Sequence, residues 1–255
     1  MINLLSAFLL RDTAIEKNYR FHFAVKVFDI VFQLSIFYFL SRLMPGQDYF
    51  SFILAGLMFS RFFQFWLNVF AQNIRQEQYW GTAELLFLSP RPPLLVLFSS
   101  SGGKFLLLAV ELLFYTLIGK YLFHAAFSFS VAGLIPVLLL TTLMFAGIGL
   151  VSGSFIMYFK RGDPANWLIA TSFDVLSGVY FPLTLMPRWL QAVSALLPTT
   201  AALGAWRQAV LYHSLPSAGQ MLVLSAWAAG FLLLGFFSFQ AAVWHTKIKG
   251  ELGSY

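Results

Sequence analysis

The sequence predicts an all-α integral membrane protein, on the strength of three observations. Of the 255 residues, 59% are hydrophobic and 10% are charged, whereas soluble domains carry about 25% charged residues. Several apolar runs approach or exceed the ~18 residues of a membrane-spanning helix. Cysteine is absent, which excludes a disulfide framework and a thiolate metal site.

Hydropathy along the chain gives six expected transmembrane helices, near residues 23–43, 50–71, 105–123, 132–158, 166–186 and 219–244. At the N-terminus, charged residues precede the first long apolar run and no small-residue cleavage pattern follows it, so we expect no cleavable signal peptide. Apolar residues of this segment instead share one face of a short amphipathic helix in the interface plane: Leu4, Leu5, Phe8, Leu9 and Ile15. This helix is either a simple anchor or a functional element.

The distribution of basic residues predicts the orientation. With the N-terminus in the cytoplasm, most lysines and arginines fall in the inner connections, and Arg61 lies inside a span. Both termini are therefore expected to be cytoplasmic. The net charge is +6, and the sixteen basic residues are scattered singly between apolar runs. This distribution indicates lipid headgroups as partners and no nucleic acid.

The connection from Gln72 to Lys104 is the longest on the expected cytoplasmic side. It contains a predicted short helix around Ala83 to Leu88, which is bounded by Gly81 and by Ser89-Pro90. An amphipathic helix in this position either docks a partner or packs on the inner ends of the spans. Both interpretations stay open.

The segment from Ser177 to Leu211 is broken by Pro182, Pro187 and Pro198. The piece between Pro187 and Pro198 holds ten residues and reaches about 15 Å as a helix, half of a ~30 Å hydrocarbon core. A piece of this length can dip into a bilayer but cannot cross it. Such broken backbone is tolerated only where protein or a water-filled path covers its polar groups, so the segment indicates a transport protein.

Arg61 lies near the middle of the second span, and a charged group at this depth needs a partner. Asp29 on the first span is the expected partner, because a long arginine side chain can reach it. Glu111 and Asp174 are rival partners.

Amide side chains continue the same helix face at helical spacing, with Gln64 and Asn68 following Arg61. The whole intramembrane polar network either holds the helices in register or lines the substrate path. Abundant aromatic residues near the span ends are expected to be interface anchors, although they also suit an amphipathic cargo.

Three segments together resemble type-2 ABC exporter (ABC-2) permeases. GTAELLFLSP at 81–90 is similar to their cytoplasmic "GTLE-LL-SP" segment, with Ala83 in place of a bulkier leucine. KRGDPANW at 160–167 resembles their second inner loop, and the segment 177–211 resembles their outer region. The order and membrane side of the three agree, and the resemblance implies a single permease domain over residues 1–255 without a nucleotide-binding domain.

The resemblance also implies partners and roles. A permease of this kind pairs with a second copy, most simply as a homodimer, and docks on two copies of a separate ABC ATP-binding subunit in the cytoplasmic membrane of a bacterium or archaeon. Coupling to that ATPase is implied for Gly81, Thr82, Glu84, Leu85, Ser89 and Pro90. The resemblance also implies that the segment from Gly178 to Leu211 is a re-entrant helical hairpin at the outer end of the path. An outer gate is implied for Gly178, Pro182, Pro187, Trp189 and Pro198.

The chain is expected to be a transport subunit with no catalytic site and no cofactor of its own. A Walker A loop needs GxxxxGK[ST], and the nearest segment has Phe98 and Phe105 in place of the first glycine and the hydroxyl residue. ATP and Mg²⁺ are therefore expected on the partner. The four histidines are far apart in the sequence, so no metal site is expected.

The expected cargo is hydrophobic or amphipathic, such as a drug or a lipid. Three alternatives stay open. The first is export of a lipid-linked polysaccharide of the O-antigen type. The second is an ion-coupled secondary transporter that uses Arg61, Asp29, Glu111 and Asp174 as coupling groups. The third is a membrane scaffold without a path.

Overall fold

The computed structural model describes residues 2–18, 20–43, 49–82, 84, 91–159 and 163–249. The regular elements in this part of the chain are all helical, which confirms the predicted all-α fold. They are α1 (Ile2–Asn18), α2 (Arg20–Arg42), α3 (Tyr49–Tyr79), α5 (Pro93–Tyr121), α6 (Val131–Phe159), α7 (Asp163–Leu176), the 3₁₀ helix η1 (Leu183–Leu185), α8 (Arg188–Ala195), α9 (Pro198–Leu211) and α10 (Ala218–Lys249).

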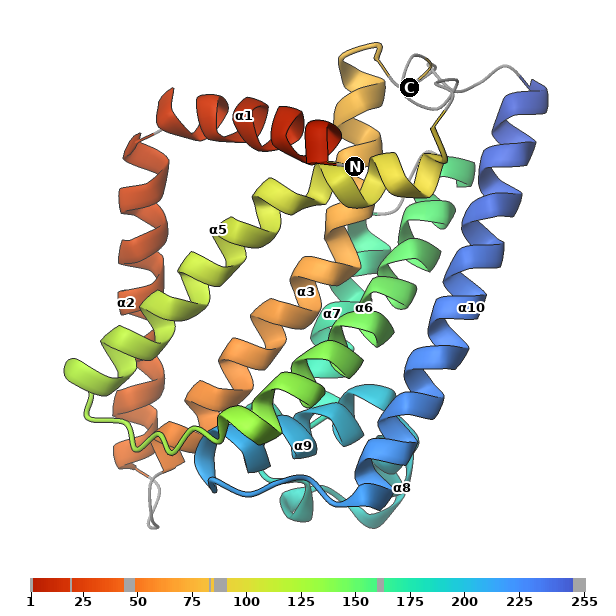
Figure 1. Cartoon of the computed structure of the whole chain (residues 1–255). Coiled ribbons are helices and arrows are strands. Elements are labelled where there is room, and N and C mark those ends of the chain that lie inside the picture. The colour runs from red at the N-terminus through yellow and green to blue at the C-terminus, as the bar shows by residue number, and fades with distance from the viewer. Residues whose placement is uncertain are drawn as a thin grey trace.

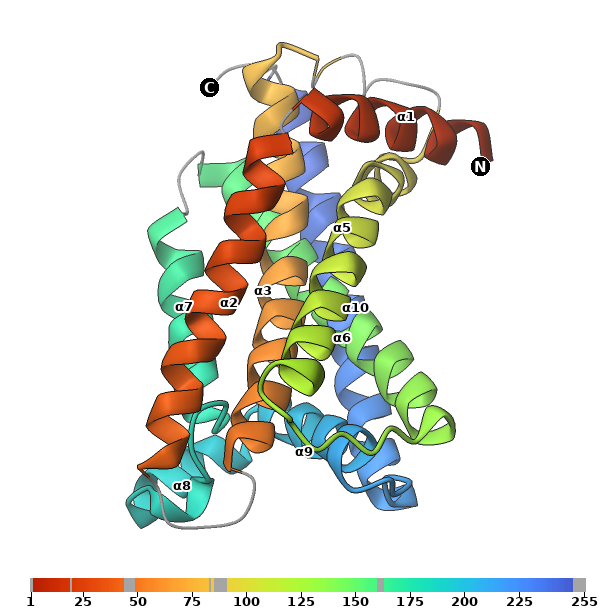
Figure 2. The same cartoon turned by 90° about the vertical axis from the view of Figure 1, so that its left-hand side faces the viewer.

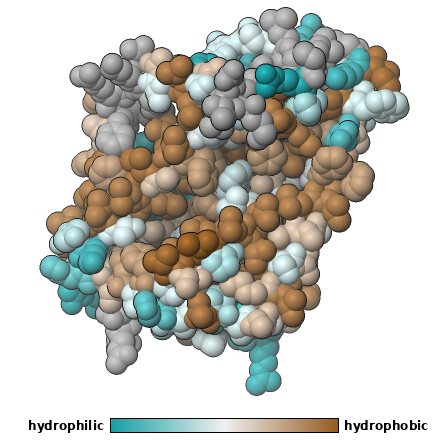
Figure 3. Space-filling model, in the orientation of Figure 1, coloured by the Kyte–Doolittle hydropathy of each residue, from teal (hydrophilic) through white to brown (hydrophobic). Residues whose placement is uncertain are grey.

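The long helices run between two ends of the molecule that differ in structure. In both views α1 lies across one end of the bundle, while α8 and α9 lie at the opposite end (Figures 1 and 2). The start of α2 and the last turns of α3 and α10 lie at the α1 end (Figure 1). The face seen in Figure 3 is mainly hydrophobic at mid-height and more hydrophilic toward both ends, as in a protein that crosses a bilayer.

Five of the described helices are long and apolar enough to cross a membrane, and the protein is therefore a multi-pass membrane protein. The predicted span over residues 166–186, the fifth of the six, is wrong, because this segment is not one continuous helix. α7 has 14 residues and ends at Leu176, so it reaches about 21 Å. The amides of Gly178 and Val179 bond to the carbonyls of Val175 and Asp174, and Gly178 has a φ of 77°, which is the Schellman ending of a helix.

The predicted boundary between the second span and the inner connection is also wrong. α3 continues from Gln72 to Tyr79, and α5 begins at Pro93, so the connection between these helices covers only residues 80–92. Hydropathy falls at Gln72 because polar residues begin there. Asn73, Glu77 and Gln78 are nevertheless buried. Ser100 of α5 accepts a hydrogen bond from Asn73, and Arg11 of α1 donates one to Glu77.

α3 is the central helix of the bundle. In its spanning window 78% of the residues are buried, against 11% in α2 and 22% in α10. Aromatic side chains of α3 pack on Phe145 of α6 and Trp206 of α9. A Cβ at Gly149 of α6 would collide with the carbonyl of Trp66 on α3, so glycine allows these two backbones to approach closely.

Candidate functional site

Arg61 connects three helices in the middle of the bundle. Its Nη2 lies 3.4 Å from Oδ2 of Asp29 on α2 and 3.3 Å from Oε1 of Gln33. On the other side, its Nε lies 3.7 Å from Oε1 of Glu111 on α5 and donates to the Tyr115 hydroxyl at 3.1 Å. The structure thus brings Arg61 to Asp29 and also to the rival Glu111. Both ion-pair distances exceed the 2.7–2.9 Å of a strong charge-assisted hydrogen bond.

Tyr115 was missed by sequence reasoning, although it closes this network. It is fully buried, and its hydroxyl donates to Oε1 of Gln33 at 2.5 Å. Tyr115 lies four residues after Glu111, on the same face of α5, and this spacing could have indicated it. Arg61, Gln33 and Tyr115 therefore form a connected set from α3, α2 and α5.

Asp174 belongs to a second branch of polar contacts. Its Oδ2 accepts hydrogen bonds from the Ser60 hydroxyl at 2.7 Å and from Nε2 of Gln64 at 3.0 Å. Arg61 is not among the hydrogen-bond or ion-pair partners of Asp174 in the described structure. This branch joins α3 to α7, whereas the Arg61 branch joins α3 to α2 and α5.

Asn68 extends the second branch toward the α1 end. Its Oδ1 accepts from Nδ2 of Asn166 on α7 at 3.1 Å, and Oδ1 of Asn166 accepts from the Ser152 hydroxyl of α6 at 2.9 Å. Asn166 was not singled out from the sequence. Its only signal was its place in the KRGDPANW segment.

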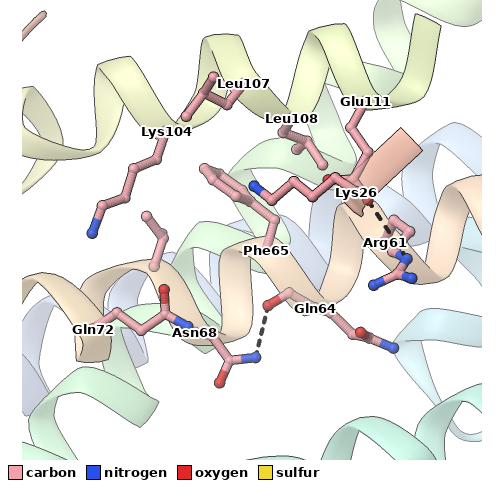
Figure 4. A pocket seen from close by; sticks show the side chains of 11 residues that line it. Lys26, Arg61, Gln64, Phe65, Asn68, Gln72, Lys104, Leu107, Leu108 and Glu111 are labelled. Atoms are coloured by element: carbon pink, nitrogen blue, oxygen red, sulfur yellow. Dashed lines mark hydrogen bonds and ion pairs between the residues drawn. The ribbon is translucent and has the colours of Figure 1, made fainter. Parts of the chain in front are cut away.

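A cavity of about 390 Å³ lies beside these contacts, between α2, α3 and α5 (Figure 4). Its volume falls within the ~300–1,000 Å³ that is typical of ligand pockets. Phe65, Val69, Leu107 and Leu108 form apolar parts of its wall. The polar lining consists of Lys26, Arg61, Gln64, Asn68, Gln72, Lys104 and Glu111.

The end of α3 positions the start of the predicted coupling segment. Gly81 has a φ of 71°, and the amides of Gly81 and Thr82 bond to the carbonyls of Gln78 and Glu77. This Schellman ending requires the left-handed backbone that glycine adopts without strain. Glu84 is exposed, while Ala83, Leu85, Ser89 and Pro90 lie outside the described residues.

Glu77 links this segment to α1, which sequence reasoning missed. Its Oε1 accepts from Nη1 of Arg11 at 2.7 Å, and its Oε2 accepts from the Thr82 hydroxyl at 2.5 Å. The Arg11 guanidinium also lies over the rings of Phe8 and Trp80, 4.7 and 5.4 Å from their centroids. Glu77 is only 6% exposed, so this carboxylate is a buried connection between α1, α3 and Thr82.

In the segment of the predicted outer gate, each short helix begins at or directly after a proline. Pro182 and Pro187 directly precede η1 and α8, and Pro198 is the first residue of α9, where a missing amide hydrogen costs nothing. Trp189 lies on the exposed face of α8. Gly178 forms the turn after α7.

Arg207 of α9 fixes this turn against α3, and sequence reasoning missed that role. Its Nη2 donates to the carbonyl oxygens of Gly178 at 2.9 Å, Val179 at 3.0 Å and Phe52 at 3.4 Å. Its guanidinium also lies 3.5 Å from the centroid of the Phe52 ring. A family model described as ABC-2 type transporter matches residues 5–211, a stretch that holds the polar network, the cavity and the segment from Gly178 to Pro198.

The chain belongs to the ABC-2 type transporter family. As an ABC-2 permease it is the membrane subunit of a transport system, and permeases of this family typically work with an ABC ATPase partner. The comparison with curated proteins gave no match. In the described part of this ABC-2 permease, no group of three or more His, Asp or Glu residues gathers in a way that suits a metal ion.

Proposed function

We propose that this chain is the permease subunit of an ATP-driven exporter for a hydrophobic or amphipathic substrate, drug-like or lipid-like, in the cytoplasmic membrane of a bacterium or archaeon. The observation that carries the proposal is the family match over residues 5–211. Two copies of a separate ABC ATPase bind ATP and Mg²⁺. Residues 1–255 act as one permease domain within a homodimer, with both termini in the cytoplasm.

The contacts at the α1 end support a coupling role for Gly81, Thr82, Glu84, Leu85, Ser89 and Pro90. Thr82 is bonded to Glu77 on the last turns of α3, and Glu77 is bonded to Arg11 of α1. A force on the segment after Gly81 therefore acts directly on α3 and α1. Because α3 is the most buried span, its displacement changes the packing of every helix around it.

A displacement of α3 would change the contacts of the polar network. Arg61 makes long ion pairs to α2 and α5, while Gln64 and Asn68 bond to α7. We infer that the ATPase cycle shifts α3 between these two groups of partners and thereby rearranges the path. The segment with Gly178, Pro182, Pro187, Trp189 and Pro198 then opens to release the cargo.

Affinity purification of the tagged chain from its native membranes tests the assignment. We expect a Walker-motif ATPase to co-purify with the parent chain and to be lost or uncoupled with Glu84→Lys, because this exposed carboxylate lies on the proposed docking side. Lys120→Glu is the matched control, since Lys120 is an exposed charge in the last turn of α5 at the α9 end. If no nucleotide-binding protein co-purifies while other membrane complexes survive, the exporter assignment is wrong.

A further inference from the structure

The cavity between α2, α3 and α5 carries an excess of positive charge. Its lining holds three basic side chains, Lys26, Arg61 and Lys104, but a single carboxylate, that of Glu111. Glu111 lies 3.7 Å from Arg61, which also contacts Asp29. Neither lysine has a carboxylate within 4.0 Å among the described residues. An anionic ligand would balance this local excess of positive charge.

Lys104 is held in place by neutral acceptors. Its Nζ donates to Oδ1 of Asn73 at 2.5 Å and to Oε1 of Gln76 at 3.1 Å. Asn73 is itself fixed, because its Nδ2 bonds to the hydroxyls of Ser100 and Ser101 at 3.0 and 2.9 Å. An ammonium group has three N–H donors. Two are occupied here, so one remains for a ligand in the cavity.

Lys26 and Gln72 supply further donors to the same space. Neither side chain forms a hydrogen bond or ion pair with another described residue. Figure 4 shows Lys26 and Lys104 projecting into the gap between α3 and α5, from different helices. Gln72 lies seven residues before the end of α3, about 10 Å along the helix. The donor groups therefore gather toward the α1 end of the spans, near headgroup level.

An apolar cleft between α2 and α5 continues from this cavity. It has a volume of about 30 Å³, shares Lys26, Leu107 and Glu111 with the larger cavity, and is otherwise lined by Val27, Ile30, Val110 and Phe114. Cationic donors thus lie next to a narrow apolar slot. This juxtaposition matches an amphiphile with an anionic head and a hydrocarbon chain, whereas a free anion makes no use of the slot.

We propose that the cavity binds the phosphate headgroup of an anionic membrane lipid, with the first methylene groups of a hydrocarbon chain of that lipid against the apolar cleft between α2 and α5. Lys26 and Lys104 bind the phosphate, and Gln72 donates a hydrogen bond to it. Hydrogen bonds between an ammonium group and a phosphate are charge-assisted, and they are therefore shorter and stronger than neutral hydrogen bonds. The binding requires neither ATP nor an ATPase, so it stands apart from the exporter assignment.

Titration of the full chain with lipid, followed by native mass spectrometry in detergent, tests this site. The probes are phosphatidylglycerol, which has a net negative charge, and phosphatidylcholine, which has none. We expect the parent chain to bind phosphatidylglycerol more tightly than phosphatidylcholine. In the double variant Lys26→Gln/Lys104→Gln, we expect the affinity for phosphatidylglycerol to fall by on the order of tenfold. Lys120→Gln, on α5 but outside the cavity, and Lys247→Gln, on α10, are controls that should bind as the parent chain does.

Three results would overturn the proposal. In the first, the double variant binds phosphatidylglycerol as the parent chain does. In the second, glycerol 3-phosphate displaces the lipid at equal concentration, which makes the ligand a free phosphate ester. In the third, Lys104→Arg, which keeps the charge, binds as weakly as Lys104→Gln.

Folding is checked first by thermal unfolding of each variant. If the double variant does not fold, Lys26→Gln alone carries the test, because Lys26 is exposed and no described contact depends on it. The assay contains no ATPase and no transport step. Its failure therefore leaves the exporter proposal untouched, and the reverse also holds.

Discussion

Arg61 is the residue on which the contacts among α2, α3 and α5 depend. Replacing it with glutamine removes the cation beside Glu111, whose side chain is 24% exposed, and beside Asp29, whose side chain is 64% exposed. Loss of one partner of a buried pair costs about 3–5 kcal/mol, and we expect about 1–3 kcal/mol because the Arg61 side chain is 32% exposed. Thermal unfolding in detergent measures the change, with Arg188→Gln on the exposed face of α8 as the control.

Transport by the same variant separates the two roles of the network. If Arg61→Gln lowers stability and Arg61→Lys restores both stability and transport, the charge holds the helices in register. If Arg61→Lys restores stability but not transport, the guanidinium takes part in the path. Unchanged stability and transport in both Arg61→Gln and Asp29→Asn would show that the observed ion pair contributes nothing.

Arg207 offers a second test at the level of one side chain. Its three carbonyl partners come from Phe52 on α3 and from the turn at Gly178 and Val179. Hydrogen bonds to a charged group contribute about 1.5–3 kcal/mol, so Arg207→Gln should lower the unfolding midpoint clearly. Hydrogen exchange should rise at residues 177–181 and stay unchanged in α10; equal protection in parent and variant would contradict the role assigned to Arg207.

At the scale of elements, Gly81 determines how α3 ends. A side chain at its φ of 71° costs about 1–2 kcal/mol, although a Cβ there would meet no neighbour within 4 Å. Gly81→Ala should therefore destabilise the last turn of α3 through backbone strain alone. Gly204→Ala is the matched control, because Gly204 is helical, also has open space around it and has no positive φ. Hydrogen exchange over residues 77–82 measures the difference, and equal exchange in the two variants would exclude strain as the cause.

The element boundaries mark the limit of what the sequence predicts. Long apolar runs located the five long spanning helices of the described chain, because burial in lipid demands such runs. They failed at Gly178, where a helix ends within an apolar run, since hydropathy does not record backbone conformation. They failed again at Gln72, where a helix continues through polar residues that α1 and α5 satisfy. The first error concerns a local backbone conformation, and the second concerns contacts between segments distant in the sequence.

The same limit applies to the candidate site. Depth and spacing brought Arg61 and Asp29 together as expected, because helix geometry converts residue number into depth. Nothing in the spacing indicated Glu77 as the link between α1 and Thr82, or Arg207 as the link between α9 and the Gly178 turn. Arg11 and Glu77 are 66 residues apart in the sequence, and Gly178 and Arg207 are 29 residues apart. Whether such residues come into contact depends on how whole helices pack.

For the whole molecule, the proposed mechanism requires that motion at the α1 end reaches the Arg61 network through α3. Glu77 is the point at which this can be tested, because it joins Arg11 and Thr82 but does not line the cavity. Glu77→Gln removes the charge that binds Arg11 and keeps the side-chain shape. We expect the ATPase to co-purify normally, while substrate-dependent stimulation of its ATP hydrolysis falls several-fold because part of the force is lost in relative motion of α1 and α3. Arg188→Gln, at an exposed position on α8 at the opposite end of the molecule (Figure 1), should leave that stimulation at the parental level. Full stimulation in Glu77→Gln would mean that force reaches α3 without the Arg11–Glu77–Thr82 connection.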